Sequence, residues 1–467
     1  MKEFFKKLCS DASLVGASYL VFNKGKIVEK VNYGVSDLET GKKVTNNTVF
    51  RIASVSKILV ALCIMCLYEE NKLDLDADIS EYLGFKVRNP KYPNEIINLK
   101  MVLTQTSSIT DGLEFAEGDE KDSGYNSING TNIDCSLQDL LDPNGKYFVK
   151  ETYSNYNPGS HFQYSNLGCG ILACVVEKVT GKYFTEYIKD IIFKPLKLDA
   201  SFVVSDIKSK DVASTYIMKN GEHVKLRDRE LFEKGVYKLF PLGDNFRGPA
   251  GGCFISTNGL MKIMQTLLDG GAPIIKEETL HRMMQMTWAG KTGAYESYSA
   301  KGLQLMITDY FDNRRLWGHF GDAYGVKSHF LFNKKEQFGM VFITNGGGYK
   351  YQECGYSDVQ EKLIKETLDK YWAPEVASTF RFNINEKFGY LLDRKIEIKT
   401  RVSKGVVYFS KLSIFDAFGI STLDDYDYVN KASRIASLDE ILDHLKDKYD
   451  FDILKGEDSY MVSYRHQ

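Results

Sequence analysis

The amino-acid sequence predicts an α/β (α+β) protein built around an antiparallel sheet flanked by helices. Two strand-like runs, Gly16–Phe22 and Lys26–Tyr33, are joined by a short polar turn, which is typical of a β-hairpin. From Leu303 onward, four runs of strand composition follow one another across short turns: GLQLMI, RRLWGHFG, YGVKSHFLF and FGMVFITN. Between these two regions, roughly residues 75–250, helical patterns alternate with polar loops and predict a mostly helical subdomain.

The helices are predicted from apolar periodicity and flanking residues. A short extended segment, Phe50–Ala53, leads into the longest of them, about Ser54–Asn71, whose apolar run is almost uninterrupted. The other predicted helices are Lys2–Ser10, Gly168–Val179, Tyr183–Ile191 and a closing helix, Ser357–Tyr371.

The chain of 467 residues is long enough for two or three domains. We expect a first domain at 1–374 and a small α+β domain at 375–467, because the pattern restarts after Trp372-Ala373-Pro374. In the second domain, residues 395–400 alternate as KIEIKT, and Ser437 and Glu440 form a capping box before a helix. His444 and His466 are interpreted as surface histidines, and the sequence assigns this domain no role.

Composition excludes several classes of function. The 60 Lys and Arg against 62 Asp and Glu lack the basic excess of a nucleic-acid-binding protein. The longest apolar run, residues 58–67, is about half of what spans a bilayer, and the amino terminus has no apolar segment of a signal peptide. We therefore expect a cytoplasmic protein without a membrane span that acts on a small molecule or short peptide. Oligomeric state is not encoded in any recognisable pattern.

Cys63 and Cys66 form a C-x-x-C pair, a pattern found in redox and metal sites. The pair lies inside the apolar helix, and no second Cys or His pair follows at metal-ligand spacing. Core packing is therefore the favoured interpretation. No metal or organic cofactor is expected.

Ser54 and Lys57 are the first candidate catalytic residues. Three positions apart at a helix start, they share one face, about 5–6 Å apart at Cβ. Burial and the positive end of the helix dipole both disfavour a charged lysine, so its pKa falls toward that of a usable base. A serine hydroxyl needs such a neighbour to act as a nucleophile. The alternative is a helix-capping serine beside a lysine that reaches water.

Three more polar side chains stand at comparable places. Tyr164 and Asn166 alternate in a short segment before an apolar helix, so both can face one cleft. His319 lies between two strand runs, where Gly321 and Gly325 would let a ligand approach the backbone. The alternatives are two polar loop residues and a structural histidine.

Taken together, the order S-x-x-K, Y-x-N, H-x-G resembles the serine β-lactamase and penicillin-binding-protein superfamily. The likeness is greatest to the branch of class C β-lactamases, D-alanyl-D-alanine carboxypeptidases, D-aminopeptidases and related esterases. It covers about residues 12–372 and extends to segments 48–57, 72–79, 158–168, 194–198 and 249–257. It implies a β-lactamase/transpeptidase-like fold, with the active site between the sheet and the helical subdomain.

The resemblance also implies residue roles. Ser54 would be the nucleophile, Lys57 would help to take its proton, and Tyr164 would act as general base and acid. Asn166 would bind the acyl-side amide of the substrate, and the backbone N–H groups of Ser54 and Asp322 would form the oxyanion hole. The segment that replaces the K-T-G of many relatives would supply His319 as a further catalytic residue and would line the substrate site with Phe320, Gly321 and Asp322.

Two departures from the family pattern stand out. The usual H-T-S-G is replaced by Gln105-Thr-Ser-Ser108, which removes a histidine and a glycine. His319 replaces lysine, as in D-specific peptidases and esterases. A literal K-T-G at 291–293 precedes the strand block and is rejected. Asp322 is either a group that attracts a substrate amine or a polar turn residue.

The favoured function is a serine hydrolase that forms an acyl-enzyme on an amide or ester bond, most simply in a small peptide or D-amino-acid amide. A carboxylesterase or weak β-lactamase of the same fold is the first alternative. A protein that binds peptides or peptidoglycan fragments without turnover is the second, and a redox or metal protein is the third.

Overall fold

The structure is a computed structural model. It describes residues 1–112, 124–234, 238–290, 300–311, 314–352, 355–372, 377–383, 388–391, 394–398, 400–403, 406–420, 422, 425, 428–429, 434–455 and 459–466. The rejected K-T-G at 291–293 lies outside these residues.

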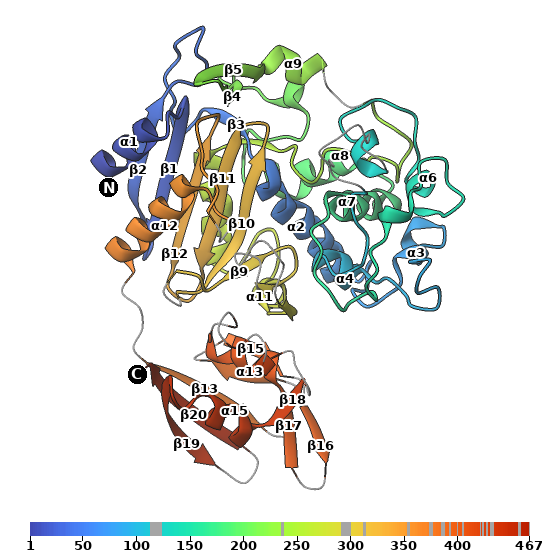
Figure 1. Cartoon of the computed structure of the whole chain (residues 1–467), viewed down its shortest axis with the longest axis vertical. Coiled ribbons are helices and arrows are strands. Elements are labelled where there is room, and N and C mark those ends of the chain that lie inside the picture. Colours follow the sequence, from blue (N-terminus) through green and yellow to red (C-terminus); the bar gives the residue numbers. More distant parts are fainter. Residues whose placement is uncertain are drawn as a thin grey trace.

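An eight-stranded sheet organises the larger part of the described residues, and its neighbouring strands run antiparallel (Figure 1). The predicted hairpin near the amino terminus pairs with the last strand of the block that begins at Leu303. The two strand regions predicted from sequence therefore join into one sheet. The strand order is β2 (Lys26–Gly34), β1 (Gly16–Asn23), β12 (Phe338–Thr344), β11 (Val326–Asn333), β10 (Leu316–Ala323), β9 (Met306–Thr308), β8 (Ala300–Lys301) and β7 (Trp288–Ala289).

Helices cover both faces of this sheet. On one face, α1 (Lys2–Asp11) and α12 (Asp358–Tyr371) bury Phe5, Leu363 and Leu368 against Tyr19 and Phe342. On the other face lie α2 (Ser56–Glu69) and α10 (Thr257–Leu268), within a larger core that continues into the helical subdomain. The fold class, an antiparallel sheet flanked by helices beside a mostly helical subdomain, is as predicted.

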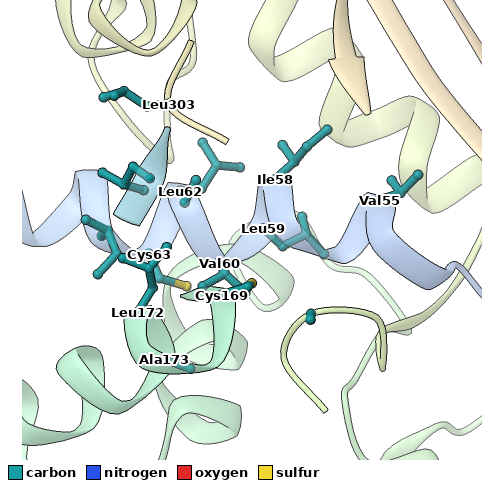
Figure 2. Packing of buried hydrophobic residues seen from close by; sticks show 14 of the residues in the cluster. Val55, Ile58, Leu59, Val60, Leu62, Cys63, Cys169, Leu172, Ala173 and Leu303 are labelled. Carbon is teal, nitrogen blue, oxygen red and sulfur yellow. The ribbon is translucent and has the colours of Figure 1, made fainter. Parts of the chain in front are cut away.

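Helix α2 is buried on all sides, which explains its lack of an amphipathic pattern. It packs against α7 (Asn166–Thr180), where Cys63 faces Cys169, Leu172 and Ala173 (Figure 2). Cys63 and Cys66 are buried free thiols whose pKa values burial raises. Both cysteines therefore behave as core residues.

Between the two strand regions lie short helices and further short strands. Strand β3 (Val49–Arg51) overlaps the predicted extended segment Phe50–Ala53 and pairs with β6 (Phe254–Ser256), which sequence periodicity did not predict. The hairpin of β4 (Thr215–Lys219) and β5 (Glu222–Arg227) was not predicted either. The helices are α3 (Ile79–Leu83), α4 (Leu99–Leu103), α5 (Tyr125–Ile128), α6 (Leu137–Leu141), α8 (Phe184–Ile188), α9 (Arg229–Lys234) and α11 (Glu277–Met284).

The described residues from 377 onward form an α+β body that lies below the sheet in Figure 1. Its strands are β13 (Ala377–Asn383), β14 (Phe388–Leu391), β15 (Arg394–Glu397), β16 (Thr400–Ser403), β17 (Val406–Ser410), β18 (Ile435–Ser437), β19 (Tyr449–Lys455) and β20 (Ser459–His466), with helices α13 (Lys411–Phe418) and α15 (Leu438–Leu445). The predicted capping box of Ser437 and Glu440 is present at α15.

One detail of this body differs from the sequence prediction: the run KIEIKT is split between β15 and β16 and is not one strand. His444 is exposed, as predicted. Its Nε2 lies 2.8 Å from Asp425 Oδ1, and its ring stacks on Tyr428. Among the described residues, no helix is both long and apolar enough to cross a bilayer.

A buried ion cluster ties the C-terminal body to the sheet. Arg315, just before β10, donates to both carboxylate oxygens of Asp309 at 2.9 and 3.0 Å and to Asp416 Oδ1 at 3.2 Å. Asp416, on α13, also accepts the Met286 backbone N–H at 2.8 Å. All three charged side chains are at most 5% exposed, so each depends on the others for compensation.

We expect Arg315→Met to lower the free energy of unfolding by about 3–5 kcal/mol, because two buried carboxylates would lose their cation. Chemical denaturation followed by circular dichroism measures the loss. Lys7→Met is the control, since its ion pair with Asp11 is exposed and contributes little. Equal stability of the two variants would contradict the structural role given to Arg315.

Candidate active site

Ser54 lies in a 3₁₀ turn, Ala53–Val55, between β3 and α2, and not in the first turn of the helix itself. Ala53 before it has φ +48°, a strained conformation for a residue with a Cβ. Strand β10 passes close beneath this turn: a Cβ on Gly321 would lie 2.1 Å from Ser328 Oγ and 2.6 Å from Ile52 O. Gly321 thus allows the sheet to support the serine directly.

Lys57 is fully buried, and its ammonium group has three acceptors. Nζ donates to Ser54 Oγ at 3.1 Å, to Asn166 Oδ1 at 2.8 Å and to the Ala250 carbonyl at 2.9 Å. Burial lowers the pKa of Lys57 to about 8, and the Asp111 carboxylate acts against this shift. The predicted contact with Ser54 is present, and the alternative of a lysine that reaches water is wrong.

Tyr164 approaches the same serine from the helical subdomain. Its hydroxyl donates to Ser54 Oγ at 2.7 Å, and Lys57 Nζ lies 4.7 Å from its ring centroid. Burial raises the pKa of Tyr164 above its ordinary value, so the side chain is a neutral phenol at physiological pH. The serine oxygen is therefore flanked by a low-pKa amine and a proton donor.

Asn166 is the first residue of α7, because Ser165 caps this helix through its bond to Gly168 N–H. The prediction of an extended segment that includes Asn166 is thus wrong by one residue, although Tyr164 and Asn166 do line the same cleft. Asn166 Nδ2 donates to Asp111 Oδ2 at 2.8 Å, which directs Oδ1 toward Lys57.

Asp111 is a buried carboxylate that sequence inspection missed. It accepts hydrogen bonds from the backbone N–H groups of Asn166 and Leu167 at 3.0 and 2.8 Å and from Ser165 Oγ at 3.0 Å. It therefore fixes the start of α7 and the orientation of the Asn166 amide. In the sequence, the only signal for a role of Asp111 is its position just after Gln105–Ser108. No periodicity in the sequence links Asp111 to Asn166.

His319 lies on β10 with its ring centroid 6.2 Å from that of Tyr164. Burial, together with the nearby charges of Lys301 and Lys57, holds its pKa well below the usual value. Nδ1 is 2.6 Å from the Phe320 carbonyl, an acceptor, so we assign the proton to Nδ1 and leave Nε2 as an acceptor. Donation from Nε2 to a substrate carboxylate would require the other tautomer.

The rest of this segment divides between core and cleft. Phe320 contributes to both: its ring packs in the core beneath α12, 4.4 Å between centroids from the ring of Tyr356, and the residue also lines the cleft. Asp322 is half exposed, and its carboxylate forms an ion pair with Lys327 at 2.5 Å and also accepts from Tyr351 OH. Its charge is thus partly compensated before any ligand arrives.

The described residues enclose a cleft of about 1570 Å³ between the sheet and the helical subdomain. It is lined by Ser54, Tyr164, Asn166, Phe320, Gly321 and Asp322 among others. Near the cleft, Ser108 stands where the family pattern has glycine. It adopts φ +66°, a conformation that glycine would take without strain, and its Oγ accepts a hydrogen bond from Asn89 at 3.1 Å.

A serine bonded to a buried lysine and a tyrosine, at the junction of an antiparallel sheet and a helical subdomain, is the site expected of a β-lactamase/transpeptidase-fold protein. Residues 1–357 match the family described as Beta-lactamase. The chain belongs to this family.

The chain is also similar to several known proteins. Protein flp of Staphylococcus aureus (strain MRSA252) is 26% identical over 333 residues, which are 71% of this chain and 59% of that protein. Esterase EstB of Burkholderia gladioli is 31% identical over 227 residues, 48% of this chain and 56% of that protein. The chain thus spans under two thirds of these relatives. The structure of D-amino acid amidase from Ochrobactrum anthropi SV3 with L-phenylalanine amide superposes with TM-score 0.60 at 19% identity, over 79% and 99% of the two chains.

Proposed function

We propose that the protein is a serine hydrolase that cleaves the amide bond of small D-amino-acid amides or short peptides through an acyl-enzyme on Ser54. The observation that carries the proposal is the convergence of Lys57 Nζ and Tyr164 OH on one serine oxygen, at 3.1 and 2.7 Å. Within the family, we place it with the class C β-lactamase and D-aminopeptidase-like branch. The likeness in fold to a D-amino acid amidase supports the amide substrate.

The chemistry follows from the two pKa directions. Neutral Lys57 takes the Ser54 proton while Oγ bonds to the carbonyl carbon, and the backbone N–H groups of Ser54 and Asp322 stabilise the oxyanion. The C–N bond then breaks as Tyr164 OH protonates the leaving amine, and Lys57 returns a proton to Tyr164. Water attacks the ester by the same steps in reverse. Neutral His319 contributes a hydrogen-bond acceptor beside Tyr164.

Activity is expected to rise with pH. Lys57 can accept a proton only when it is neutral, and its pKa of about 8 means that about a tenth is neutral at pH 7. We predict that kcat/KM increases from pH 6, with an apparent pKa near 8, and levels off above it. Steady-state rates across this range test the prediction. A flat profile, or one set by a group titrating near 6, would contradict Lys57 as the base.

A carboxylesterase is the second candidate, favoured by the match to esterase EstB. Hydrolysis of D-phenylalaninamide, L-phenylalaninamide, p-nitrophenyl butyrate and a chromogenic cephalosporin separates the candidates. We expect the D-amide to be the best substrate, and Asp322→Asn to raise its KM without affecting that of the ester, because only the amide carries a free amine. Faster cleavage of the ester, with no effect of Asp322→Asn, would replace the amidase proposal with the esterase.

A further inference from the structure

A second pocket adjoins the cleft on the far side of the Gly248–Gly252 segment. Arg51, Gly248 and Tyr324 line both the cleft and this pocket. Its volume is about 110 Å³, somewhat smaller than the roughly 150 Å³ of an engineered apolar cavity that holds benzene. Two edge-to-face pairs contribute to its wall, Phe184 with Phe202 at 5.1 Å and Phe232 with Phe254 at 4.9 Å between centroids. These walls suit a compact aryl or branched aliphatic group.

Two arginines stand where the pocket meets the cleft. The guanidinium carbons of Arg51 and Arg227 lie 4.6 and 5.6 Å from the ring centroid of Tyr324. Arg51 Nε donates to the Gly251 carbonyl at 2.9 Å. Neither arginine forms an ion pair within the part of the chain that the structure describes, so two like charges share one tyrosine. An anion at this place would relieve their repulsion.

Two other charged side chains on the pocket wall are buried and hydrogen-bonded. Glu177 is 1% exposed and accepts from the backbone N–H groups of Phe184 and Gly243 at 3.1 and 2.7 Å, and from Asn245 Nδ2 at 3.0 Å. Arg247 is 4% exposed and donates to the carbonyls of Ile128 and Ile133. A ligand would therefore meet the less buried charges of Arg51 and Arg227, which are positive.

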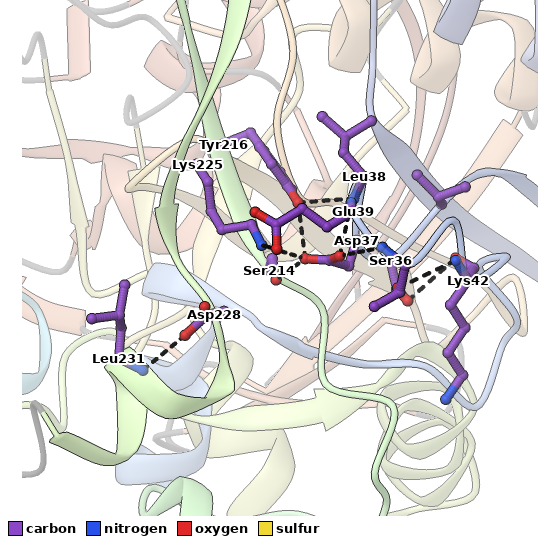
Figure 3. A network of polar contacts seen from close by, with 12 residues as sticks. Ser36, Asp37, Leu38, Glu39, Lys42, Ser214, Tyr216, Lys225, Asp228 and Leu231 are labelled. Atoms are coloured by element: carbon purple, nitrogen blue, oxygen red, sulfur yellow. Dashed lines mark hydrogen bonds and ion pairs between the residues drawn. The ribbon is translucent and has the colours of Figure 1, made fainter.

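The hairpin that carries Arg227 is firmly held (Figure 3). The Asp37 carboxylate accepts from Ser214 Oγ at 2.7 Å and Tyr216 OH at 3.0 Å, and pairs with Lys225 at 2.9 Å. The same hairpin also fixes the turn beside Tyr324, because a Cβ on Gly325 would lie 1.8 Å from Tyr216 O. The two guanidinium groups are thus presented by a preorganised frame.

We propose that this pocket binds a small carboxylic acid with an aryl or branched apolar body, its carboxylate held by Arg51 and Arg227. The site is separate from the acyl-enzyme chemistry and does not depend on it. The Gly248–Gly252 segment separates the pocket from the cleft, and its Ala250 carbonyl accepts a hydrogen bond from Lys57. A ligand in the pocket would therefore lie beside the segment that contacts Lys57 without entering the cleft.

The test is calorimetric titration of the Ser54→Ala protein with phenylacetate, with 2-phenylethanol and acetate as partial probes. We expect saturable binding of phenylacetate. 2-Phenylethanol lacks the carboxylate and acetate lacks the aryl group, so each should bind roughly tenfold or more weakly than phenylacetate. Arg227→Met should weaken phenylacetate by a similar factor, whereas Lys219→Met on the same hairpin should not. Val203→Phe, which fills the pocket, should abolish binding while circular dichroism shows a folded protein.

Three results would overturn the proposal: no saturable binding, equal affinity for 2-phenylethanol, or full affinity in Arg227→Met. A fourth result would show whether the acid binds in the pocket or in the cleft. Wild-type protein phosphonylated at Ser54 should still bind phenylacetate, and loss of binding there would place the acid in the cleft. Failure of phosphonylation itself would count against the proposed hydrolase and leave the Ser54→Ala titration as the test of the pocket.

Discussion

Lys57→Met is expected to reduce kcat/KM by roughly 10²–10⁴-fold, the range that general base catalysis contributes. Methionine keeps the apolar stem in the core but supplies no group that can take the Ser54 proton. It also leaves Asn166 Oδ1 and the Ala250 carbonyl without their donor. The residual rate should lose its dependence on a group of pKa about 8.

Lys91→Met is the matched control, because Lys91 lines the same cleft and donates to the Tyr153 carbonyl at 3.1 Å without touching Ser54. Its kcat/KM and pH profile should stay close to wild type. If Lys57→Met retained the wild-type pH profile, another base would have to activate the serine.

Asp111→Asn is expected to lower maximal kcat/KM by roughly 10–100-fold, the equivalent of one or two hydrogen bonds to a charged group. The new amide cannot accept from Asn166 Nδ2 and the backbone N–H groups together, so the Asn166 amide loses its fixed orientation. Asp111 also raises the pKa of Lys57. The pH profile should therefore shift to lower pH while its plateau falls.

That shift distinguishes a positioning role from simple loss of stability, which would lower the plateau alone. Asp142→Asn is the control, because Asp142 accepts only local bonds from residues of its own turn. A plateau reduced without any shift would remove Asp111 from the electrostatic account of Lys57.

The parts of the fold that sequence predicted are those with local signals. The hairpin of β1 and β2, the strand block from β9 to β12 and the closing helix α12 each carry their own periodicity and turns. Ser54 and Lys57 belong to the same category, because a three-residue spacing on a helix start is readable without tertiary structure. The resemblance to a known family then supplied Tyr164, Asn166 and His319.

What sequence did not predict depends on contacts between distant segments. Asp111 acts on a residue 55 positions away, and the approach of Gly321 to Ala53 joins strand β10 to the turn before α2. The hairpin of β4 and β5 is short and mostly half exposed, so its pattern does not stand out from a polar loop. The neutral state of His319 follows from burial that only the folded chain provides.

The central claim is that Ser54 is an activated nucleophile. Intact mass spectrometry after treatment with a fluorophosphonate, on wild type and Ser54→Ala side by side, tests it most directly. The account predicts one phosphonyl adduct on wild type, formed as Oγ displaces fluoride from phosphorus, and none on Ser54→Ala. An unmodified wild-type protein, or an equal adduct on both, would contradict it.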